Sequence, residues 1–374
     1  YGVPRPDTGE ILSATTWSLD TWGQNLVACA NTDGKLYEWD LNIANDAAAI
    51  TNAPTNCVGL VVTAERIIMA LGAAGDKRRI DWCDQENNTI WTPGATNQAG
   101  SYNITSNGSL MCAKRVRGLT IIFTDVDVHT ATYIGTPYIY SFDRVGSGCG
   151  IISKQAVAST DNSCLWMSRS GFWIYDGFAK PLPCDVGDFV FNDINYAQDS
   201  KIYCVHNSAY GEVWWFYPSG SSTEVDAYVS YNYREGHWNI GNLARTCGTD
   251  RGVFSSPLMV STDGYIYEHE TGLIDAEEEN IYAQSGPIEL NGGGSSMYVE
   301  RVIPDEKTLG DVEISFTTKA YPTSNEVSYG PYTASQPTDV RFTGTQVKVK
   351  LEANQTADWR VGLTRLQAKT TGKR

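Results

Sequence analysis

Histidine is scarce in this chain of 374 residues, and so are the sequence motifs of enzymes. The four histidines are His129, His206, His237 and His269, and none stands at metal-ligand spacing from another. The chain has no H-E-x-x-H, G-x-S-x-G or G-x-x-x-x-G-K-[ST] pattern, which are the motifs of zinc proteases, serine hydrolases and phosphate-binding loops. The sequence therefore predicts no catalytic residue, no cofactor and no metal, and so a protein that is not an enzyme.

Basic residues are outnumbered by acidic ones. Lysine and arginine total 28 against 43 aspartates and glutamates, which leaves a formal net charge of −15. This charge opposes non-specific binding to nucleic acid and to anionic membranes. It suits solubility, and it equally suits a surface along which DNA slides without sticking. No apolar run approaches the roughly 20 residues of a membrane helix, so we expect no membrane segment.

The nine cysteines are odd in number and form no C-x-x-C pair. Most of them stand in apolar stretches, where a free cysteine behaves as a small hydrophobic residue. This pattern favours assembly in a reducing cytoplasm over secretion with disulfides.

Long helices are also missing from the pattern. No stretch sustains a 3.6-residue apolar period, and we expect only a short helix around residues 186–194. Aromatic residues make up 11% of the chain and glycine numbers 35, which suits strands and turns. The sequence predicts an all-β protein.

Two segments 230 positions apart carry nearly the same sequence. TDGKLYEWD (32–40) is echoed by TDGYIYEHE (262–270), and each follows an apolar run. Each predicts a strand, an Asp-Gly turn and a second strand. The turns contain Asp33 and Gly34 in the first copy and Asp263 and Gly264 in the second. We expect both aspartates to accept hydrogen bonds from the backbone of their own turns.

The spacing of the glycines defines a period. A weaker copy surrounds Gly171, which lies 137 residues after Gly34 and 93 before Gly264. A step of about 46 residues fits three times into the first distance and twice into the second. This step is close to the length of a propeller blade. It predicts further turns near residue 80, at Asp125 and Asp127, and at Gly220. Six such units predict a six-bladed β-propeller over residues 12–279, with a β-sandwich as the alternative.

The pattern changes after residue 279. Strands predicted at 298–302, 312–317, 340–342, 346–351 and 359–366 make residues 280–374 a small antiparallel β-sandwich. Residues 1–11 look like the remnant of a longer N-terminal segment.

Two sets of residues are candidates for contacts with other molecules. One is the adjacent pair Trp214 and Trp215, whose side chains must point to opposite faces of a strand. One of the two is therefore expected in the core and the other at the surface or in an interface. The other set is the basic C-terminus, which is either a solvated tail or a docking site for an acidic neighbour: Arg360, Arg365, Lys369, Lys373 and Arg374.

Several segments resemble structural proteins of tailed bacteriophages. They are RIDWCDQEN (79–87) with WTP (91–93), RGLTIIFTD (117–125), the segment 166–177, EVWWFYP (212–218), and the ending 359–374. The chain is most similar to the tail nozzle or hub family of short-tailed phages, also called packaged-DNA stabilisation proteins. No functional residue carries over individually.

The resemblance implies a structural virion protein, assembled in the bacterial cytoplasm and located in the tail. It implies a ring of this chain, usually of six copies, below the portal and adaptor. Such a ring extends the channel for double-stranded DNA, helps to retain the DNA until ejection, and supports fibres or a needle.

Two other functions compete with this one. A glycan-binding or glycan-cleaving propeller would use the many aromatic residues, with carboxylates such as Glu38 and Glu268 or with a clamp of three arginines. The candidate arginines are Arg117, Arg144, Arg169, Arg234, Arg245 and Arg251. His129, Asp125 and Asp127 would contribute to a hydrolytic or cation-binding site. Aspartates in a turn more often stabilise the turn itself by hydrogen bonds to its backbone. An intracellular interaction scaffold is the second competing function.

Overall fold

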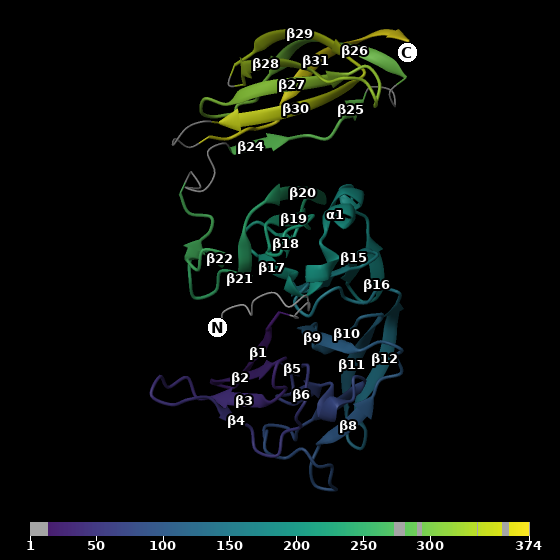
Figure 1. Ribbon diagram of the computed structural model, residues 1–374, viewed down its shortest axis with the longest axis vertical. Helices are drawn as coiled ribbons and strands as arrows, with labels where there is room; N and C mark the ends of the chain where they lie inside the picture. The colour runs from purple at the N-terminus through teal and green to yellow at the C-terminus, as the bar shows by residue number, and fades with distance from the viewer. Residues whose placement is uncertain (1–13, 273–280, 290–293, 335, 354–358, 374) are drawn as a thin grey trace. The chain divides into compact units, whose positions relative to one another are not determined.

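The chain forms two compact units, residues 1–270 and 271–374, in a computed structural model (Figure 1). The structure describes residues 14–272, 281–289, 294–334, 336–353 and 359–373. The expected N-terminal remnant (1–11) and the expected boundary at 279–280 lie outside these residues.

The first unit is a series of six antiparallel sheets that follow one another in chain order. The first sheet contains β1 (Trp17–Trp22), β2 (Asn25–Ala30), β3 (Leu36–Trp39) and β4 (Ala48–Ala49). The second contains β5 (Gly59–Val62), β6 (Ile68–Leu71), β7 (Arg79–Trp82) and β8 (Gly100–Asn103). The third contains β9 (Leu110–Val116), β10 (Leu119–Thr124), β11 (Asp127–Gly135) and β12 (Ile139–Ser147). The fourth sheet contains β13 (Val157–Ser159), β14 (Cys164–Ser168), β15 (Gly171–Tyr175) and β16 (Ala179–Leu182). The fifth contains β17 (Tyr203–Asn207), β18 (Glu212–Tyr217), β19 (Ala227–Asn232) and β20 (His237–Asn242). The sixth contains β21 (Arg245–Thr249), β22 (Leu258–Ser261) and β23 (Ile266–Glu268).

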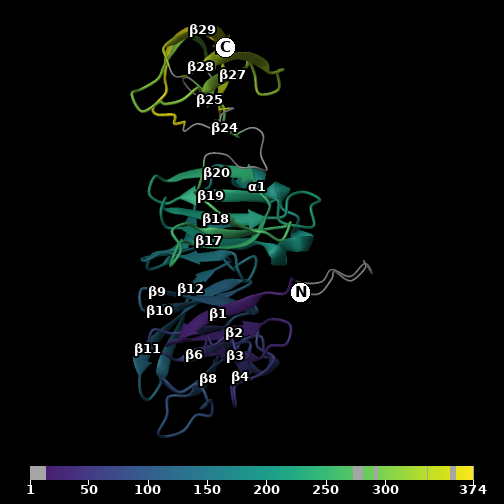
Figure 2. The same ribbon diagram turned by 90° about the vertical axis from the view of Figure 1, so that its left-hand side faces the viewer.

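These sheets are the blades of a propeller. The first strand of each sheet contacts the first strand of the next, from β1 and β5 through to β17 and β21. The bridge between Gln155 and Tyr203 is parallel, so the inner strands of the fourth and fifth sheets run in the same direction. Figure 2 shows the four strands β17 to β20 side by side in one blade. The prediction of an all-β, six-bladed propeller is confirmed.

The period of about 46 residues marks the same connection in every blade. Each predicted turn joins the second strand of a sheet to the third, including the looser one between β6 and β7. Two residues assigned to turns are corrected: Asp127 is the first residue of β11 and Gly171 is the first residue of β15. Gly171 has φ of 145°, a conformation that favours glycine and carries the chain from the turn into the strand.

Aromatic side chains fill the space between neighbouring blades. Trp166 and Trp215 are fully buried, and their indole N–H groups donate to the carbonyls of Cys149 and Ala156. Phe172 contacts Trp215 with ring centroids 4.9 Å apart, which joins the fourth and fifth blades. Burying large rings with their polar atoms satisfied is a strong source of stability.

The helices of the first unit are short. Helix α1 (Gly187–Asp193) lies at the predicted position and packs through the buried Val190. Two 3-10 helices, η1 (Ala73–Gly75) and η2 (Tyr196–Lys201), lie in other connections. Among the described residues, no helix has the length and apolar character needed to cross a membrane.

The second unit is a β-sandwich, as predicted. One sheet contains β24 (Ile281–Gln284), β25 (Ile288–Glu289), β27 (Glu313–Lys319), β28 (Val327–Thr333) and β30 (Gln346–Ala353), and the other contains β26 (Ser295–Ile303), β29 (Thr338–Gly344) and β31 (Arg365–Lys373). Apolar residues of both sheets form one core, which includes Val299, Phe316 and Phe342.

The sandwich differs from prediction in its last strand and in three strands that were not predicted, β24, β25 and β28. Residues 361–364 are a loop, and the last strand begins only at Arg365. The loop is held by side chains, since the N–H of Leu363 donates to the Asp305 carboxylate at 2.8 Å. Strand β28 was not predicted because it contains Gly330 and Pro331, which are depleted in strands, and most of it is exposed.

Replacing Trp166 with alanine should reduce the free energy of unfolding by about 3–5 kcal/mol, because it leaves a cavity between blades. Urea titration of the purified chain measures this. The control is Phe178→Ala, since Phe178 is exposed, and its cost should stay below about 1 kcal/mol. Equal costs for the two variants would contradict the described packing.

Candidate functional site

The propeller encloses a cavity of about 680 Å³ along its centre. Every blade contributes to its wall through its first strand or the residues just before that strand. The lining residues are 16–20 (β1), 58–61 (β5), 111–115 (β9), Lys154, Gln155, Val157 and Ser159 (β13), Tyr203 and Cys204 (β17), and 247–249 (β21). We call this cavity the central channel.

The charged residues of the central channel are mostly basic. Its wall contains Lys114, Arg115 and Lys154, with Asp20 as the one carboxylate among the lining residues. Arg115 pairs with Asp20 at 3.1 Å. The half-buried Lys154 donates from Nζ to the carbonyl oxygen of Val58 at 3.2 Å. Burial lowers the pKa of Lys154 below its ordinary value.

A buried hydroxyl of the channel wall lacks a partner. Tyr203 is buried, and within the described part of the chain its hydroxyl makes no hydrogen bond. Leaving such a group unsatisfied costs about 1–3 kcal/mol. The wall also contains Cys112, Cys204 and Cys247, and burial raises the pKa of all three thiols, that of Cys112 to about 12. Raised pKa values keep these thiols protonated, which disfavours metal binding and nucleophilic chemistry.

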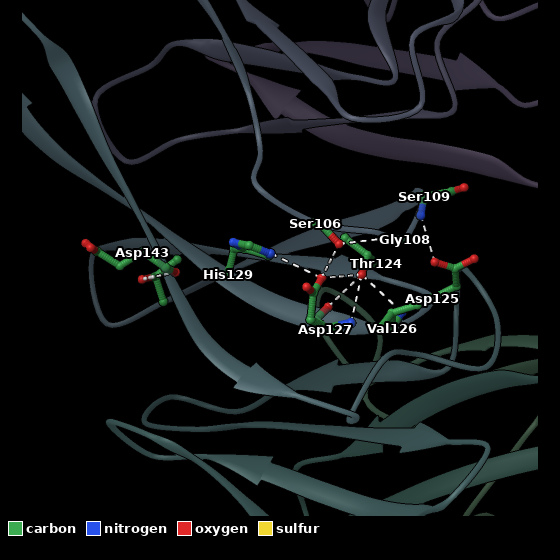
Figure 3. A network of polar contacts seen from close by, with 10 residues as sticks. Ser106, Gly108, Ser109, Thr124, Asp125, Val126, Asp127, His129 and Asp143 are labelled. Atoms are coloured by element: carbon green, nitrogen blue, oxygen red, sulfur yellow. Dashed lines mark hydrogen bonds and ion pairs between the residues drawn. The ribbon is translucent and has the colours of Figure 1, made fainter.

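His129 and Asp127 belong to a buried polar network in the third blade (Figure 3). Asp127 Oδ1 accepts hydrogen bonds from Ser106 Oγ at 2.7 Å and from Thr124 Oγ1 at 2.6 Å, and His129 Nε2 lies 3.1 Å from it. Asp125, by contrast, is exposed at the turn and accepts from the N–H of Ser109. The network ties the segment before β9 to strands β10 and β11.

The order of this network differs from that of a hydrolase. In a serine hydrolase the histidine lies between the serine and the acid, so that it can take the serine proton. Here Asp127 lies between Ser106 and His129, and the serine hydroxyl donates to the carboxylate. The arrangement satisfies buried polar groups and gives the serine no base. Among the described residues, no cluster of three His, Cys, Asp or Glu suits a metal ion.

The echoed aspartates make the same contacts in the first and sixth blades. Asp33 accepts from the N–H of Lys35 at 3.1 Å and from the Tyr37 hydroxyl at 2.5 Å. Asp263 accepts from the N–H of Tyr265 at 2.8 Å and from the Tyr267 hydroxyl at 2.7 Å. These hydrogen bonds lower the pKa of both carboxyls, mainly through Tyr37 for Asp33 and the Tyr265 amide for Asp263.

The residues considered for glycan chemistry serve separate local contacts. Glu38 accepts one amide from Asn25 and one from Asn88, each at 2.7 Å. Arg117 donates to the carbonyl of Asp176, and Arg234 donates to the carbonyls of Ser208 and Ala209. Arg169 pairs with Asp199, and Arg245 donates to His269. These four arginines bind at different places and do not form one carboxylate clamp.

The two adjacent tryptophans lie on opposite faces of β18. Trp215 is fully buried, so it is the member of the pair that lies in the core, as expected for one of the two. Trp214 is half-buried, packs on Tyr228 with ring centroids 4.5 Å apart, and donates to Glu212. Only a part of Trp214 is available to another molecule.

The basic C-terminus is largely a strand of the sandwich. Arg365 begins β31, and Lys369 in the same strand pairs with Glu300 of β26 at 2.6 Å. The interpretation as a solvated tail is therefore corrected for this segment. Arg360, Arg365 and Lys369 are exposed, and Arg360 pairs through its backbone with Leu309. Arg374 and the side chain of Lys373 lie outside the described residues.

Comparisons with known proteins give only distant similarities. No family model matches the chain, and no curated protein matches it. Solved structures that are similar include a streptogramin B lyase (9% identity, 91% of this chain and 94% of that one, TM-score 0.44) and virginiamycin B lyase from Staphylococcus aureus (7% identity, 91% and 96%, TM-score 0.43). A putative exported protein from Bacteroides fragilis is also similar (11% identity, 66% and 79%, TM-score 0.39). At these values the similarities carry no argument about function.

Asp127→Ala should destabilise the protein by about 2–4 kcal/mol, because Ser106, Thr124 and His129 lose their shared acceptor. Chemical denaturation measures the change. The exposed Asp125→Ala is the control and should cost less than about 1 kcal/mol. A mild effect of Asp127→Ala would show that the network adds little to the fold.

Acid stability should depend on the echoed aspartates. Because the pKa of Asp33 and Asp263 is lower in the folded state, their stabilisation is complete above the unfolded value of about 3.9 and is lost as the pH falls through the folded value. Unfolding midpoints in urea from pH 7 to 2.5 should therefore fall less steeply for Asp33→Asn/Asp263→Asn than for the wild type. Asp46→Asn, in the exposed β3–β4 loop, is the control and should follow the wild-type curve.

Proposed function

We propose that this chain is a structural subunit of the tail nozzle or hub of a short-tailed bacteriophage. In this role it forms a ring, with six copies expected, that extends the DNA channel below the portal and adaptor and helps to retain the DNA. The ring supports fibres or a needle and acts without catalysis. The segments that resemble this family support the proposal, and one feature of the propeller surface supports it physically.

That feature is a concentration of exposed apolar residues at one end of the propeller. In each blade the connections between strands one and two and between strands three and four lie at the same end, because the strands are antiparallel. These connections display seven large apolar side chains, which we call the apolar rim: Leu41, Ile43, Tyr138, Phe178, Tyr210, Val253 and Phe254. They come from five of the six blades.

The apolar rim is suited to contacts between proteins. Ile43 is 97% exposed. Val253 and Phe254, which are consecutive in the sequence, are exposed as well. Single exposed apolar residues are ordinary, but several of them at one end are suited to a protein interface. In a ring of identical subunits each copy uses such a surface against a neighbour or a coaxial partner. The net charge of −15 suits a wall that DNA must pass without adhering.

Electron microscopy and native mass spectrometry of the purified full chain test the proposal. We expect closed rings, with six copies as the main species. The double variant Val253→Ser/Phe254→Ser should reduce the ring population at least tenfold, because it removes apolar contact area from the rim. Tyr265→Ser, on the β22–β23 turn at the opposite end, should assemble like the wild type.

Two results would contradict the proposal. One is a chain that stays monomeric at all concentrations, both alone and with portal and adaptor proteins of short-tailed phages. The other is cleavage of a surface glycan by the purified chain, which would favour the carbohydrate-active alternative.

A further inference from the structure

We propose that the central channel of the propeller binds a small dianion, either a phosphate ester or a dicarboxylate. The shared chemistry is a pair of negatively charged oxygen groups held by Lys114 and Lys154. This inference concerns the inside of one subunit and does not depend on ring assembly or on a phage origin.

The first argument is uncompensated positive charge. Lys114 and Lys154 line the channel from the third and fourth blades. Within the described part of the chain, neither lysine forms an ion pair with a carboxylate. Asp20 is already engaged by Arg115 at 3.1 Å and by the N–H of Val62 at 2.8 Å. In a chain with a net charge of −15, two lysines without acidic partners at the centre of the fold are unusual.

The second argument is desolvation. Lys154 is half-buried and donates to one carbonyl oxygen, that of Val58. An ammonium group has three hydrogens to donate, and withdrawing it from water is costly when no counter-charge is present. Burial accordingly lowers the pKa of Lys154. A bound anion would supply the missing charge and accept the remaining hydrogen bonds.

The size of the space sets the class of ligand. A cavity of about 680 Å³ falls in the range of sites for small molecules, roughly 300–1,000 Å³. It has room for a phosphate or two carboxylates together with a small organic group. Polar and apolar residues both line the wall, including Ser18, Gln155 and Leu60. We therefore expect a small metabolite-sized anion.

Thermal unfolding and calorimetric titration of the full chain test the proposal, with inorganic phosphate and succinate as separate probes. Sodium chloride at matched ionic strength controls for screening. We expect at least one probe to bind with one site per chain and to raise the unfolding midpoint. A response to phosphate alone identifies the phosphate-ester class, and a response to succinate alone identifies the dicarboxylate class.

Variants locate the site. Lys114→Gln and Lys154→Gln should each weaken binding about tenfold, and the double variant about a hundredfold, since each removes a charged donor. Lys77→Gln is the matched control, because Lys77 is an exposed lysine outside the channel wall. Undiminished binding by the double variant, or equal weakening by the control, would overturn the proposal.

The wild-type chain provides a test that needs no variant to fold. Reductive methylation followed by mass spectrometry measures the reactivity of each lysine. A saturating probe should slow the modification of Lys114 and Lys154 at least fivefold while leaving Lys77 unchanged. Equal modification with and without both probes, or no binding of either probe up to about 10 mM, would refute the channel site.

Discussion

The sheets of this propeller carry large apolar side chains that a single sheet cannot bury alone. The fold therefore depends on packing between neighbouring blades. Phe172 and Trp215 illustrate this, since they come from adjacent blades and bury one another. Large aromatic residues suit this contact because the sheets are twisted and the gap between them is wide. The other features of the first unit follow from this stacking.

Polar side chains fix how neighbouring blades meet. Glu38 of the first blade accepts the amide of Asn88 in the second, and Arg117 of the third donates to the carbonyl of Asp176 in the fourth. Asn207 of the fifth donates to Glu270 beyond the last strand of the sixth. Each contact satisfies a polar group that packing would otherwise isolate from water. These residues include several that sequence alone offers as catalytic candidates.

The stacking of blades also creates the two surfaces with a proposed function. At the axis the first strands of six sheets face one another and leave a space that their side chains do not fill. Lys114 and Lys154 lie there although the chain as a whole is strongly acidic. At one end of the blades, the loops display the apolar rim. The central channel suits a small ligand, whereas the apolar rim suits a protein, so the two proposals concern different partners.

Local features were accessible from sequence because they depend on neighbouring residues. The Asp-Gly turns at Asp33 and Asp263 and the short helix near 186–194 reflect contacts within a few residues. The period of about 46 follows from the repeated spacing of such turns along the chain. Hence the all-β class and the six-bladed propeller were predictable. The strand at Arg365–Lys373 was misplaced because its polar residues alternate weakly and its partner, β26, is some 70 positions away.

Only the tertiary structure decided which residues share a site. Lys114 and Lys154 come from different blades, and no motif links them. Trp214 and Trp215 are identical side chains on one strand, but packing against the fourth blade buries Trp215 completely. The sequence by itself determined the blades and their number, because strands and turns arise from local preferences. The channel, the buried network of Asp127 and the apolar rim were decided by the closing of blade upon blade, because burial and charge pairing depend on residues distant in the chain.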